Sequence, residues 1–469
     1  MVEPIARSAP SRERRFGAIA AFAGTVQALW DEAKTEGLAQ RVRTFAQDTP
    51  NDLQRALALL ATIRDVAVVV HGPAGCGISA SVEQRSHGSW RVTNISERDS
   101  ILGGDAKLEA AIRDACAERE PAAIIILASP VVAINNDDIE SVASQTRDER
   151  GIPVLVIRTD GFRSKIASTG HDLVVHALVR EILAHNATEF GDAVTLLTIS
   201  ETSEDVMAMG EILRELGSEW LPFPQFSSAR DWPRVAASRH VVALDPSDAE
   251  YGGSLLHDQA GSAFVTHDAP IGASATAHWV ACVADAIGCP EAADEVISRH
   301  HFAVERSRAR MTHHRGARLY VNLPAGKAFS FVQLARELGV VVVGLQVPSL
   351  GAQDAVRLER LASEQPELPI LVGEGQAFEE VNSLLRLRPD LYVGQGNAAV
   401  HALRLGIPVL DVLSIPLYGY AGLQRLTDAI DRRLSNPALA RFLSAGDDSR
   451  YSVQSLAKST HWFIKREVK

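Results

Sequence analysis

The sequence predicts an α/β protein with three doubly wound domains, each built on a parallel sheet. Its 469 residues suggest about two to four domains, at roughly 150 residues per domain. Short apolar runs of strand length alternate with helical stretches along the chain, and this order is typical of parallel sheets covered by helices. Aromatic residues make up only 6% of the chain, whereas Ala, Val, Leu and Ile are abundant, which favours buried strands between Ala-rich helices.

The first domain follows an opening segment of about 60 residues that we expect to be helical, because Leu53, Leu57 and Leu60 recur at helical spacing. Strand and helix then alternate. The expected strands lie at 66–70, 123–127 and 154–157, and the expected helices at 107–117 and 139–150. Right-handed crossovers follow from this order.

The same order restarts twice. The expected strands lie at 194–199, 240–244 and 263–266 in the second block, and at 319–323, 340–345, 370–372, 391–393 and 409–411 in the third. We therefore expect domains at 1–190, 191–310 and 311–469, with linkers near 185–192 and 305–316. The second linker is rich in Arg and His. Such a charge run is typical of a solvated connector, and a docking surface is the alternative.

Charge and composition narrow the class of protein. The formal net charge of −11 gives no general basic surface, so nucleic acid is not an expected partner. Four cysteines form no disulfide framework in a chain of this length and fit a reducing cytoplasm. No apolar run approaches the ~20 residues that span a bilayer, so we expect a cytoplasmic protein without a membrane partner.

A Gly-rich segment, His71 to Gly77, directly follows the first apolar run. Ligands of doubly wound sheets bind beyond the carboxyl ends of strands. Gly72, Gly75 and Gly77 would let the backbone approach a bulky ligand and adopt angles closed to other residues. Cys76 lies near an expected helix N-terminus, where backbone N–H groups favour a thiolate that binds metal or acts as a nucleophile. Phosphate binding is the alternative, although the phosphate-loop pattern is missing.

Other candidate sites are weaker. Residues 324–327 are only a fragment of a phosphate loop. The His pairs at 300–301 and 313–314 lack the i, i+4 spacing of a helical metal site. Asp137 and Asp138 precede an expected helix, so we expect them to cap its N-terminus.

Four segments occur in an order that is shared with one protein family. They are His71 to Gly77; Glu97 to Gly104 with Lys107 and Leu108; Ser129 and Pro130 with Ile134 to Ile139; and Leu405 to Pro408 with Pro416 to Gly422. Together they resemble the signatures of the nitrogenase component 1 family. This family includes nitrogenase catalytic subunits, their cofactor-assembly scaffold relatives and dark-operative protochlorophyllide reductase. The resemblance spans roughly residues 65–430 and implies three Rossmann-like domains.

The resemblance also implies an iron–sulfur cluster held between two related subunits. Cys76 matches a metal-ligand position, Ser129 stands where a further ligand Cys would be, and Gly72, Gly75 and Gly77 would border the cluster. The remaining cysteines are expected to be core thiols: Cys116, Cys282 and Cys289. One thiolate cannot hold a cluster that needs about four ligands, so the partner subunit should supply the rest.

In the cofactor-bearing subunits of that family, one Cys and one His hold a large metal cofactor. The Cys would follow the second strand of the middle domain, where this chain has Asp245-Pro246-Ser247-Asp248. The His would precede the Gly-Tyr-x-Gly segment, where this chain has Val412-Leu413-Ser414-Ile415. The resemblance therefore places this chain with the partner, β-type subunits, which share the cluster but do not hold the cofactor.

Two functions follow from the resemblance. In the first, the chain is the β-type subunit of a nitrogenase-like reductase. It shares its cluster with a homologous cofactor-bearing subunit in an α2β2 heterotetramer and relays electrons from an ATP-dependent iron–sulfur reductase, with methylthio-alkanes as the favoured substrates. In the second, it is a subunit of a cofactor-assembly scaffold. An unrelated Rossmann-type enzyme, such as a glycosyltransferase or sugar epimerase, would leave Cys76 and the ordered motifs unexplained.

Overall fold

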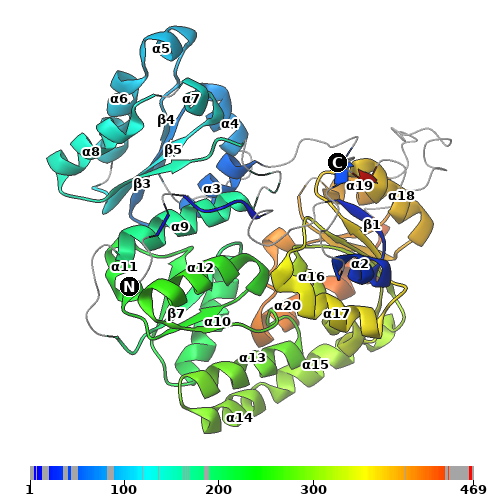
Figure 1. Ribbon diagram of the computed structural model, residues 1–469. Coiled ribbons are helices and arrows are strands. Elements are labelled where there is room, and N and C mark those ends of the chain that lie inside the picture. The colour runs from blue at the N-terminus through cyan, green and yellow to red at the C-terminus, as the bar shows by residue number, and fades with distance from the viewer. Residues whose placement is uncertain are drawn as a thin grey trace.

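Three large sheets covered by helices, and one small two-stranded sheet, form the described part of the chain in the computed structural model (Figure 1). The structure describes residues 5–6, 8–12, 21–34, 41–43, 51–81, 89–118, 120–135, 137–161, 164, 166, 168–183, 190–396, 398–438, 442 and 464–466. The large sheets lie at 66–158, 194–265 and 318–411, and one N-terminal strand joins the third. The predicted α/β fold with parallel sheets is confirmed. The domain boundaries at 190 and 310 stay predictions.

The first sheet has the strand order β4-β3-β5-β6, and all of its pairings are parallel. Its elements are α3 (Asp52–Leu60), β3 (Val66–His71), α4 (Ala74–Ser81), β4 (Ser89–Val92), α5 (Glu97–Leu102), α6 (Asp105–Glu118), β5 (Ala123–Ala128), α7 (Pro130–Asn135), α8 (Ile139–Arg150), β6 (Val154–Arg158) and α9 (Thr169–Leu183). Alternate β3 residues face opposite layers: Val68 and Val70 share a core with α3 and α9, whereas Ala67 and Val69 share one with α6 and α8. Burial on both faces explains the unbroken apolar run.

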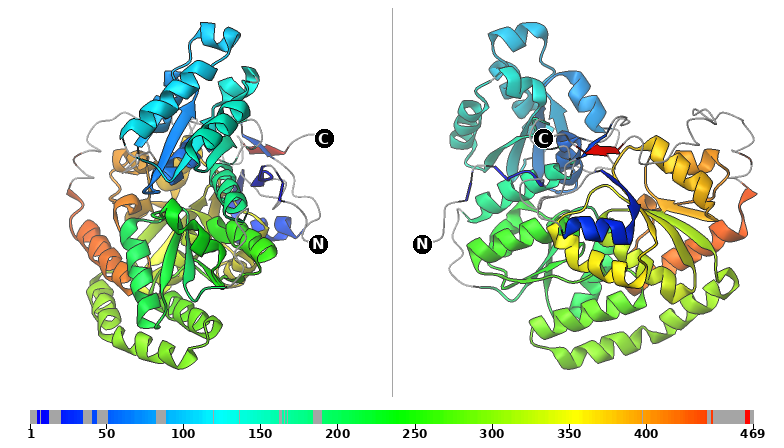
Figure 2. Two further views of the ribbon diagram at one scale, coloured as in Figure 1. Left: turned by 90° about the vertical axis from the view of Figure 1, so that its left-hand side faces the viewer. Right: turned by 45° about the vertical axis from the view of Figure 1, so that its right-hand side comes forward.

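The second sheet has the order β10-β9-β7-β8, also parallel. Its elements are β7 (Val194–Thr198), α10 (Ser203–Glu215), β8 (Trp220–Pro224), η1 (Ala229–Asp231), α11 (Trp232–Ala236), β9 (His240–Ala243), α12 (Pro246–Ala260), β10 (Ala263–Val265), α13 (Ala273–Ala286), α14 (Pro290–Arg299), α15 (His301–Met311) and η2 (Thr312–His314). Helices α13 to α15 form a layer at the base of the molecule (Figure 2).

The third sheet has the order β1-β13-β12-β11-β14-β15. Its elements are β11 (Arg318–Asn322), α16 (Ala325–Leu338), β12 (Val341–Val347), η3 (Ala352–Asp354), α17 (Ala355–Glu364), β13 (Pro369–Val372), α18 (Ala377–Leu387), β14 (Leu391–Gly394), α19 (Ala398–Arg404), β15 (Val409–Asp411), η4 (Val412–Ser414) and α20 (Gly419–Ser435). Helix α20 leaves this sheet and packs on α10, α13 and α15 of the second unit.

The opening segment differs from the expected run of helices. It contains β1 (Phe22–Thr25), α2 (Val26–Ala33) and β2 (Arg41–Arg43), and β2 pairs with β16 (Ile464–Arg466). Strand β1 pairs antiparallel with β13, although residues 1–190 were assigned to the first domain (Figure 2). The reason is that β13 would otherwise leave an open sheet edge, which proteins usually cover.

The Arg- and His-rich stretch near 305–316 is not a solvated connector. Most of it is helix α15, whose buried residues Val304, Ser307 and Met311 recur on one face. One of its basic side chains binds α20 within the same chain: Arg310 Nε lies 2.7 Å from an Asp428 carboxylate oxygen. The charge run therefore joins two helices of this chain.

Within the described residues, no helix has the length and apolarity to cross a membrane.

Candidate functional site

The Gly-rich loop and Ser129 meet at the carboxyl edge of the first sheet. Strands β3 and β5 are neighbours, and His71 pairs with Ala128 at their ends, so the residues that follow them lie together. Cys76 lies in the first turn of α4, and Ser129 directly follows β5. The Ser129 hydroxyl lies beside the Cys76 thiol and lowers its pKa, but Ser129 Oγ has no partner at hydrogen-bond geometry among the described groups. The structure thus brings together the two side chains that the sequence singled out.

Two of the three loop glycines are needed for close packing. A Cβ on Gly72 would lie 2.3 Å from Ser129 Oγ, and one on Gly77 would lie 2.2 Å from a Val92 methyl group. Gly75 is exposed and has no neighbour within 4 Å of a built Cβ. None of the three has a positive φ. The expectation of special backbone angles is therefore wrong. Gly72 and Gly77 are required instead because a side chain at either position would collide with Ser129 or with β4.

The Cys76 thiol is not activated by its surroundings alone. Burial raises the pKa of Cys76, and the neighbouring Ser129 hydroxyl only partly offsets this rise. The expected thiolate is therefore not favoured at rest, because desolvation outweighs the helix N-terminus. A metal ion would displace the thiol proton, since metal binding and deprotonation are coupled. The raised pKa argues against a free nucleophile at Cys76, and its role as a metal ligand stays a prediction.

A buried His–Asp pair lies at the start of the loop and fixes its position. His71 Nε2 lies 3.2 Å from Asp137 Oδ2, and His71 Nδ1 lies 3.0 Å from Thr93 Oγ1. Burial lowers the pKa of His71, although Asp137 opposes this shift. Asp138 caps α8 by accepting a hydrogen bond from the Ser141 N–H, as predicted. Asp137 does not cap the helix, because its carboxylate is turned toward His71.

An exposed apolar rim flanks the loop. Helices α5 and α7 contact each other at the tip of the first domain (Figure 1). They carry three large apolar side chains that are 82%, 71% and 71% exposed: Ile101, Leu102 and Ile134. Gly104, which follows α5, packs directly against His71 and Asp137. The rim therefore borders the loop that carries Cys76, and exposed apolar groups of this kind mark contact surfaces.

The part of the chain that the structure describes offers no complete metal site. Among the described residues, no three His, Cys, Asp or Glu side chains converge on one point. Cys116 and Cys289 pack against core clusters, as expected. Cys282 does not: it lies on α13, and the thiol is next to His278. Cys76 offers one of the about four ligands that an iron–sulfur cluster needs, so a cluster at this loop would require further ligands from elsewhere.

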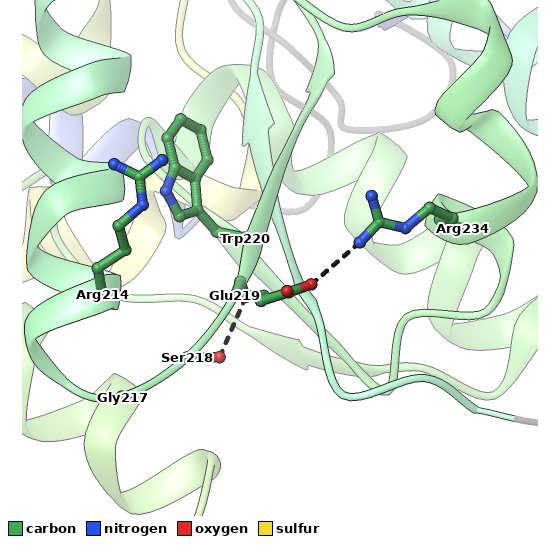
Figure 3. A pocket seen from close by; sticks show the side chains of 6 residues that line it. All are labelled: Arg214, Gly217, Ser218, Glu219, Trp220 and Arg234. Carbon is green, nitrogen blue, oxygen red and sulfur yellow. Dashed lines mark hydrogen bonds and ion pairs between the residues drawn. The ribbon is translucent and has the colours of Figure 1, made fainter.

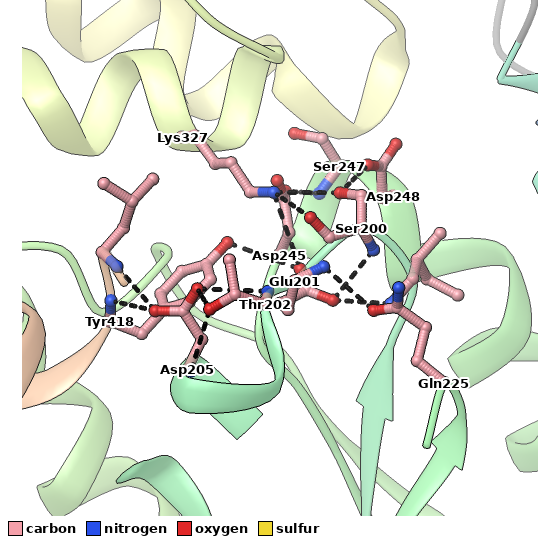
Figure 4. A network of polar contacts seen from close by, with 12 residues as sticks. Ser200, Glu201, Thr202, Asp205, Gln225, Asp245, Ser247, Asp248, Lys327 and Tyr418 are labelled. Carbon is pink, nitrogen blue, oxygen red and sulfur yellow. Dashed lines mark hydrogen bonds and ion pairs between the residues drawn. The ribbon is translucent and has the colours of Figure 1, made fainter. Parts of the chain in front are cut away.

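A buried polar network lies where the carboxyl ends of the second and third sheets face each other (Figure 4). Lys327 in the first turn of α16 donates to the carbonyl and hydroxyl oxygens of Ser200 at 3.0 and 2.9 Å. Its Nζ lies 3.9 Å from Glu201 Oε1. Asp245 follows β9, and a Cβ on Gly326 would lie 2.2 Å from Asp245 Oδ1. Helix α16 therefore approaches this carboxylate closely.

The N-terminal segment extends the network into the first domain. Arg12 donates to both carboxylate oxygens of Asp172 on α9, at 2.8 and 3.2 Å. Its Nη1 and Nη2 also lie 3.4 Å from Asp248 Oδ1 on α12. Asp248 in turn accepts a hydrogen bond from Ser200 Oγ at 3.0 Å. One continuous set of contacts therefore links residues that flank all three large sheets. It includes Asp245, which stands at the position where the resemblance places a cofactor-binding Cys.

The carboxyl groups of the network are costly to ionise. Burial and the neighbouring Asp248 raise the pKa of Asp245 to about 7, while Lys327 opposes the shift. Asp245 Oδ2 has no hydrogen-bond partner among the described groups. Burial also raises the pKa of Glu201, which Lys327 partly offsets. Lys327 is thus the cation on which this junction depends.

Replacing Asp245 by Asn should remove a pH dependence of stability. The folded protein holds the Asp245 proton up to about pH 7, whereas the unfolded chain releases it near pH 4. Parent stability should therefore fall through this window, by at most about 1.4 kcal/mol per pH unit from this group. In urea unfolding from pH 4 to 8, the free energy of unfolding of Asp245→Asn should rise relative to that of the parent until about pH 7. Parallel curves of unfolding free energy against pH for parent and variant would refute this. Asp258→Asn is the control, because Asp258 is exposed on the same helix.

A surface pocket of about 510 Å³ lies on the second domain, away from these residues (Figure 3). Arg214 lies over the Trp220 ring, 5.7 Å from its centre. Arg234 pairs with Glu219 at 3.1 Å. Because its cations already contact aromatic or acidic partners, the pocket offers no strong anion site, and none of the predicted site residues lines it.

Known proteins match this chain along most of its length. The curated relatives include proteins named nitrogenase iron-molybdenum cofactor biosynthesis protein NifE. The protein from Bradyrhizobium diazoefficiens is 24% identical over 89% of this chain and 82% of its own length. That from Clostridium pasteurianum is 25% identical over 81% of this chain and 86% of its own length. That from Rhodobacter capsulatus is 23% identical over 87% of this chain and 90% of its own length.

The fold and the family agree with these similarities. A solved structure titled "Nitrogenase Cp1 at pH 6.5" superposes with a TM-score of 0.77 and 15% identity, covering 91% of this chain and 96% of that chain. At that identity, the match speaks for the fold alone. The family model described as nitrogenase component 1 type oxidoreductase matches residues 54–435, which include the Cys76 loop, α20 and all of the polar network except Arg12. The chain therefore belongs to the nitrogenase component 1 type oxidoreductase family.

Proposed function

We propose that this chain is one subunit of a cofactor-assembly scaffold that shares an iron–sulfur cluster with a homologous partner. The observation that carries this proposal is the half-site at the edge of the first sheet, where Cys76 lies beside Ser129 and where the described residues form no group of three metal-binding side chains. The relatives named as cofactor biosynthesis proteins support assembly as the role. They favour it over the catalytic β-type reductase subunit that the sequence suggested first.

The residues of the loop would each have a defined task. Cys76 would bind iron through Sγ after losing its proton, and Ser129 would hydrogen-bond that sulfur, which tunes the cluster. Gly72 leaves space for Ser129, and the pair of His71 and Asp137 holds the loop in place. The cluster itself would supply electron storage and transfer.

The partner must cover the loop, because its ligands have to reach within bonding distance of the same cluster. The rim of Ile101, Leu102 and Ile134 borders this loop and is the apolar surface that such a partner would bury. An α2β2 assembly would use this contact twice. A separate ATP-dependent iron–sulfur reductase would deliver electrons to the complex from outside.

Leu102→Asp should weaken binding of the partner subunit. A carboxylate buried in an apolar contact loses its hydration, so we expect a dissociation constant at least tenfold higher, which is about 1.4 kcal/mol. Val356→Asp is the matched control, because Val356 is 75% exposed on α17 of the third domain. Calorimetry or co-purification of tagged partner measures both. Equal behaviour of the two variants would show that the rim is not the contact.

Two measurements distinguish a scaffold from a reductase: transfer of metal to an acceptor protein, and reduction of substrate by the complex. The complex would be isolated without oxygen, labelled with radioactive iron, and mixed with a cofactor-free catalytic component, reductase and ATP. We expect labelled metal to move to the acceptor, with no substrate reduction by the complex alone. Sustained reductase-dependent turnover without transfer would favour the catalytic reading instead.

A further inference from the structure

The surface of α13 carries a second group of metal-binding side chains, remote from the Cys76 loop. His278 and Cys282 are four positions apart and share one face of the helix. His278 is exposed and Cys282 is half-buried. The His278 Nε2 atom lies 3.5 Å from Cys282 Sγ. Neither side chain belongs to a core cluster, so packing does not account for their pairing.

The separation of the two atoms matches a tetrahedral zinc site. Zinc–sulfur bonds are about 2.3 Å and zinc–nitrogen bonds about 2.0–2.1 Å. Two such bonds at the tetrahedral angle place sulfur and nitrogen roughly 3.5 Å apart. Side chains at i and i+4 on a helix are a common source of paired zinc ligands. Because Cys282 Sγ lies 3.5 Å from Nε2 and 3.9 Å from Nδ1 of His278, the imidazole must turn to direct its Nε2 lone pair at an ion that Sγ also binds. The backbone need not move for this.

The local charge favours a cation over a reactive thiolate. Asp285 lies one turn further along the exposed side of α13. Burial and the charge of Asp285 raise the pKa of Cys282, which disfavours a free nucleophilic thiolate. A divalent cation reverses this situation, because it stabilises the sulfur anion and is attracted by the carboxylate.

We propose that His278 and Cys282 form a surface binding site for Zn²⁺, independent of the Cys76 half-site. The ion would bind the Cys282 thiolate and the neutral imidazole of His278, with water in its remaining positions. One thiol proton would be released to solvent for each ion bound. The mixed sulfur and nitrogen donors select Zn²⁺ over Mg²⁺ or Ca²⁺, which prefer oxygen.

The test is a Zn²⁺ competition titration of the full-length chain against a chromophoric chelator, under reducing conditions. His278→Ala and Cys282→Ser should each weaken Zn²⁺ binding at least tenfold. Cys289→Ala is the matched control, because that half-buried thiol contacts the Leu216 carbonyl and no His. It should bind Zn²⁺ as the parent does, and the parent should release one proton per ion.

Two results would overturn the proposal. One is unchanged affinity in both His278→Ala and Cys282→Ser. The other is loss of Zn²⁺ binding in Cys76→Ala alone, which would place the ion at the loop of the first domain. Cobalt(II) gives an independent readout, because sulfur-to-cobalt absorption should appear in the parent and vanish in Cys282→Ser. Loss of this site would leave the proposed function untouched, since the two sites lie in different domains.

Discussion

Cys76→Ala should remove most of the iron from the complex of this chain with its partner. Without Sγ, one iron of the shared cluster loses its protein ligand from this side, and clusters with open positions are readily lost. We expect iron per complex to fall at least severalfold. The measurement is iron and labile sulfide in complexes isolated without oxygen. Far-ultraviolet circular dichroism should stay unchanged, because Cys76 only partly contacts the core.

Cys116→Ala is the matched control for this variant. Cys116 is also half-buried, but it packs between α6 and the first sheet. Its replacement should cost about 1 kcal/mol of packing and leave iron unchanged. Ser129→Cys is a complementary variant that places a second thiol beside Cys76, so it should retain or increase iron. If Cys76→Ala kept the parent's iron content, Cys76 would be a packing residue of the loop.

Lys327→Met should destabilise the fold by about 3–5 kcal/mol, as expected when one partner of a buried ion network is removed. Lys327 is fully buried and is the cation nearest to Glu201. Without it, the carboxyl groups of the junction repel one another or must take up protons. Urea unfolding at pH 7.5 measures the effect, and the added variant Glu201→Gln should restore part of the loss.

Lys107→Met is the control for the loss of a lysine charge. The Lys107 side chain is 41% exposed and lies 2.7 Å from an Asp99 carboxylate, so its loss should cost less than about 1 kcal/mol. A loss of less than 1 kcal/mol in Lys327→Met as well would mean that the junction tolerates its carboxylates without this cation.

The parallel sheets were predictable because their signal is local. Strands β3 and β5 are continuous apolar runs, and burial on both faces requires such runs. Strand β1 has no comparable signal, since its four residues gain their pairing from β13, which is distant in sequence. Helix α15 did carry a signal in the spacing of Val304, Ser307 and Met311, but the dense charges obscured it.

The candidate site was predictable in part. Cys76 and Ser129 follow neighbouring strands, so topology alone brings them together. The network of Lys327 and Asp245 was not predictable, because it depends on how separate domains pack. In the sequence, the only signal at Asp245 is that it stands where the resemblance places a cofactor-binding Cys. The pair of His278 and Cys282 did have a sequence signal, the i, i+4 spacing on one helix, but Cys282 was interpreted as a core thiol.

The most direct test of the central claim is the iron content of this chain in two states, alone and with its homologous partner, both isolated without oxygen. The half-site at Cys76 predicts that the complex is brown, absorbs near ~400 nm and contains iron and sulfide in the amounts of an iron–sulfur cluster. The chain alone should hold no such cluster. A colourless complex without stoichiometric iron, or a lone chain that assembles a full cluster, would contradict the shared site.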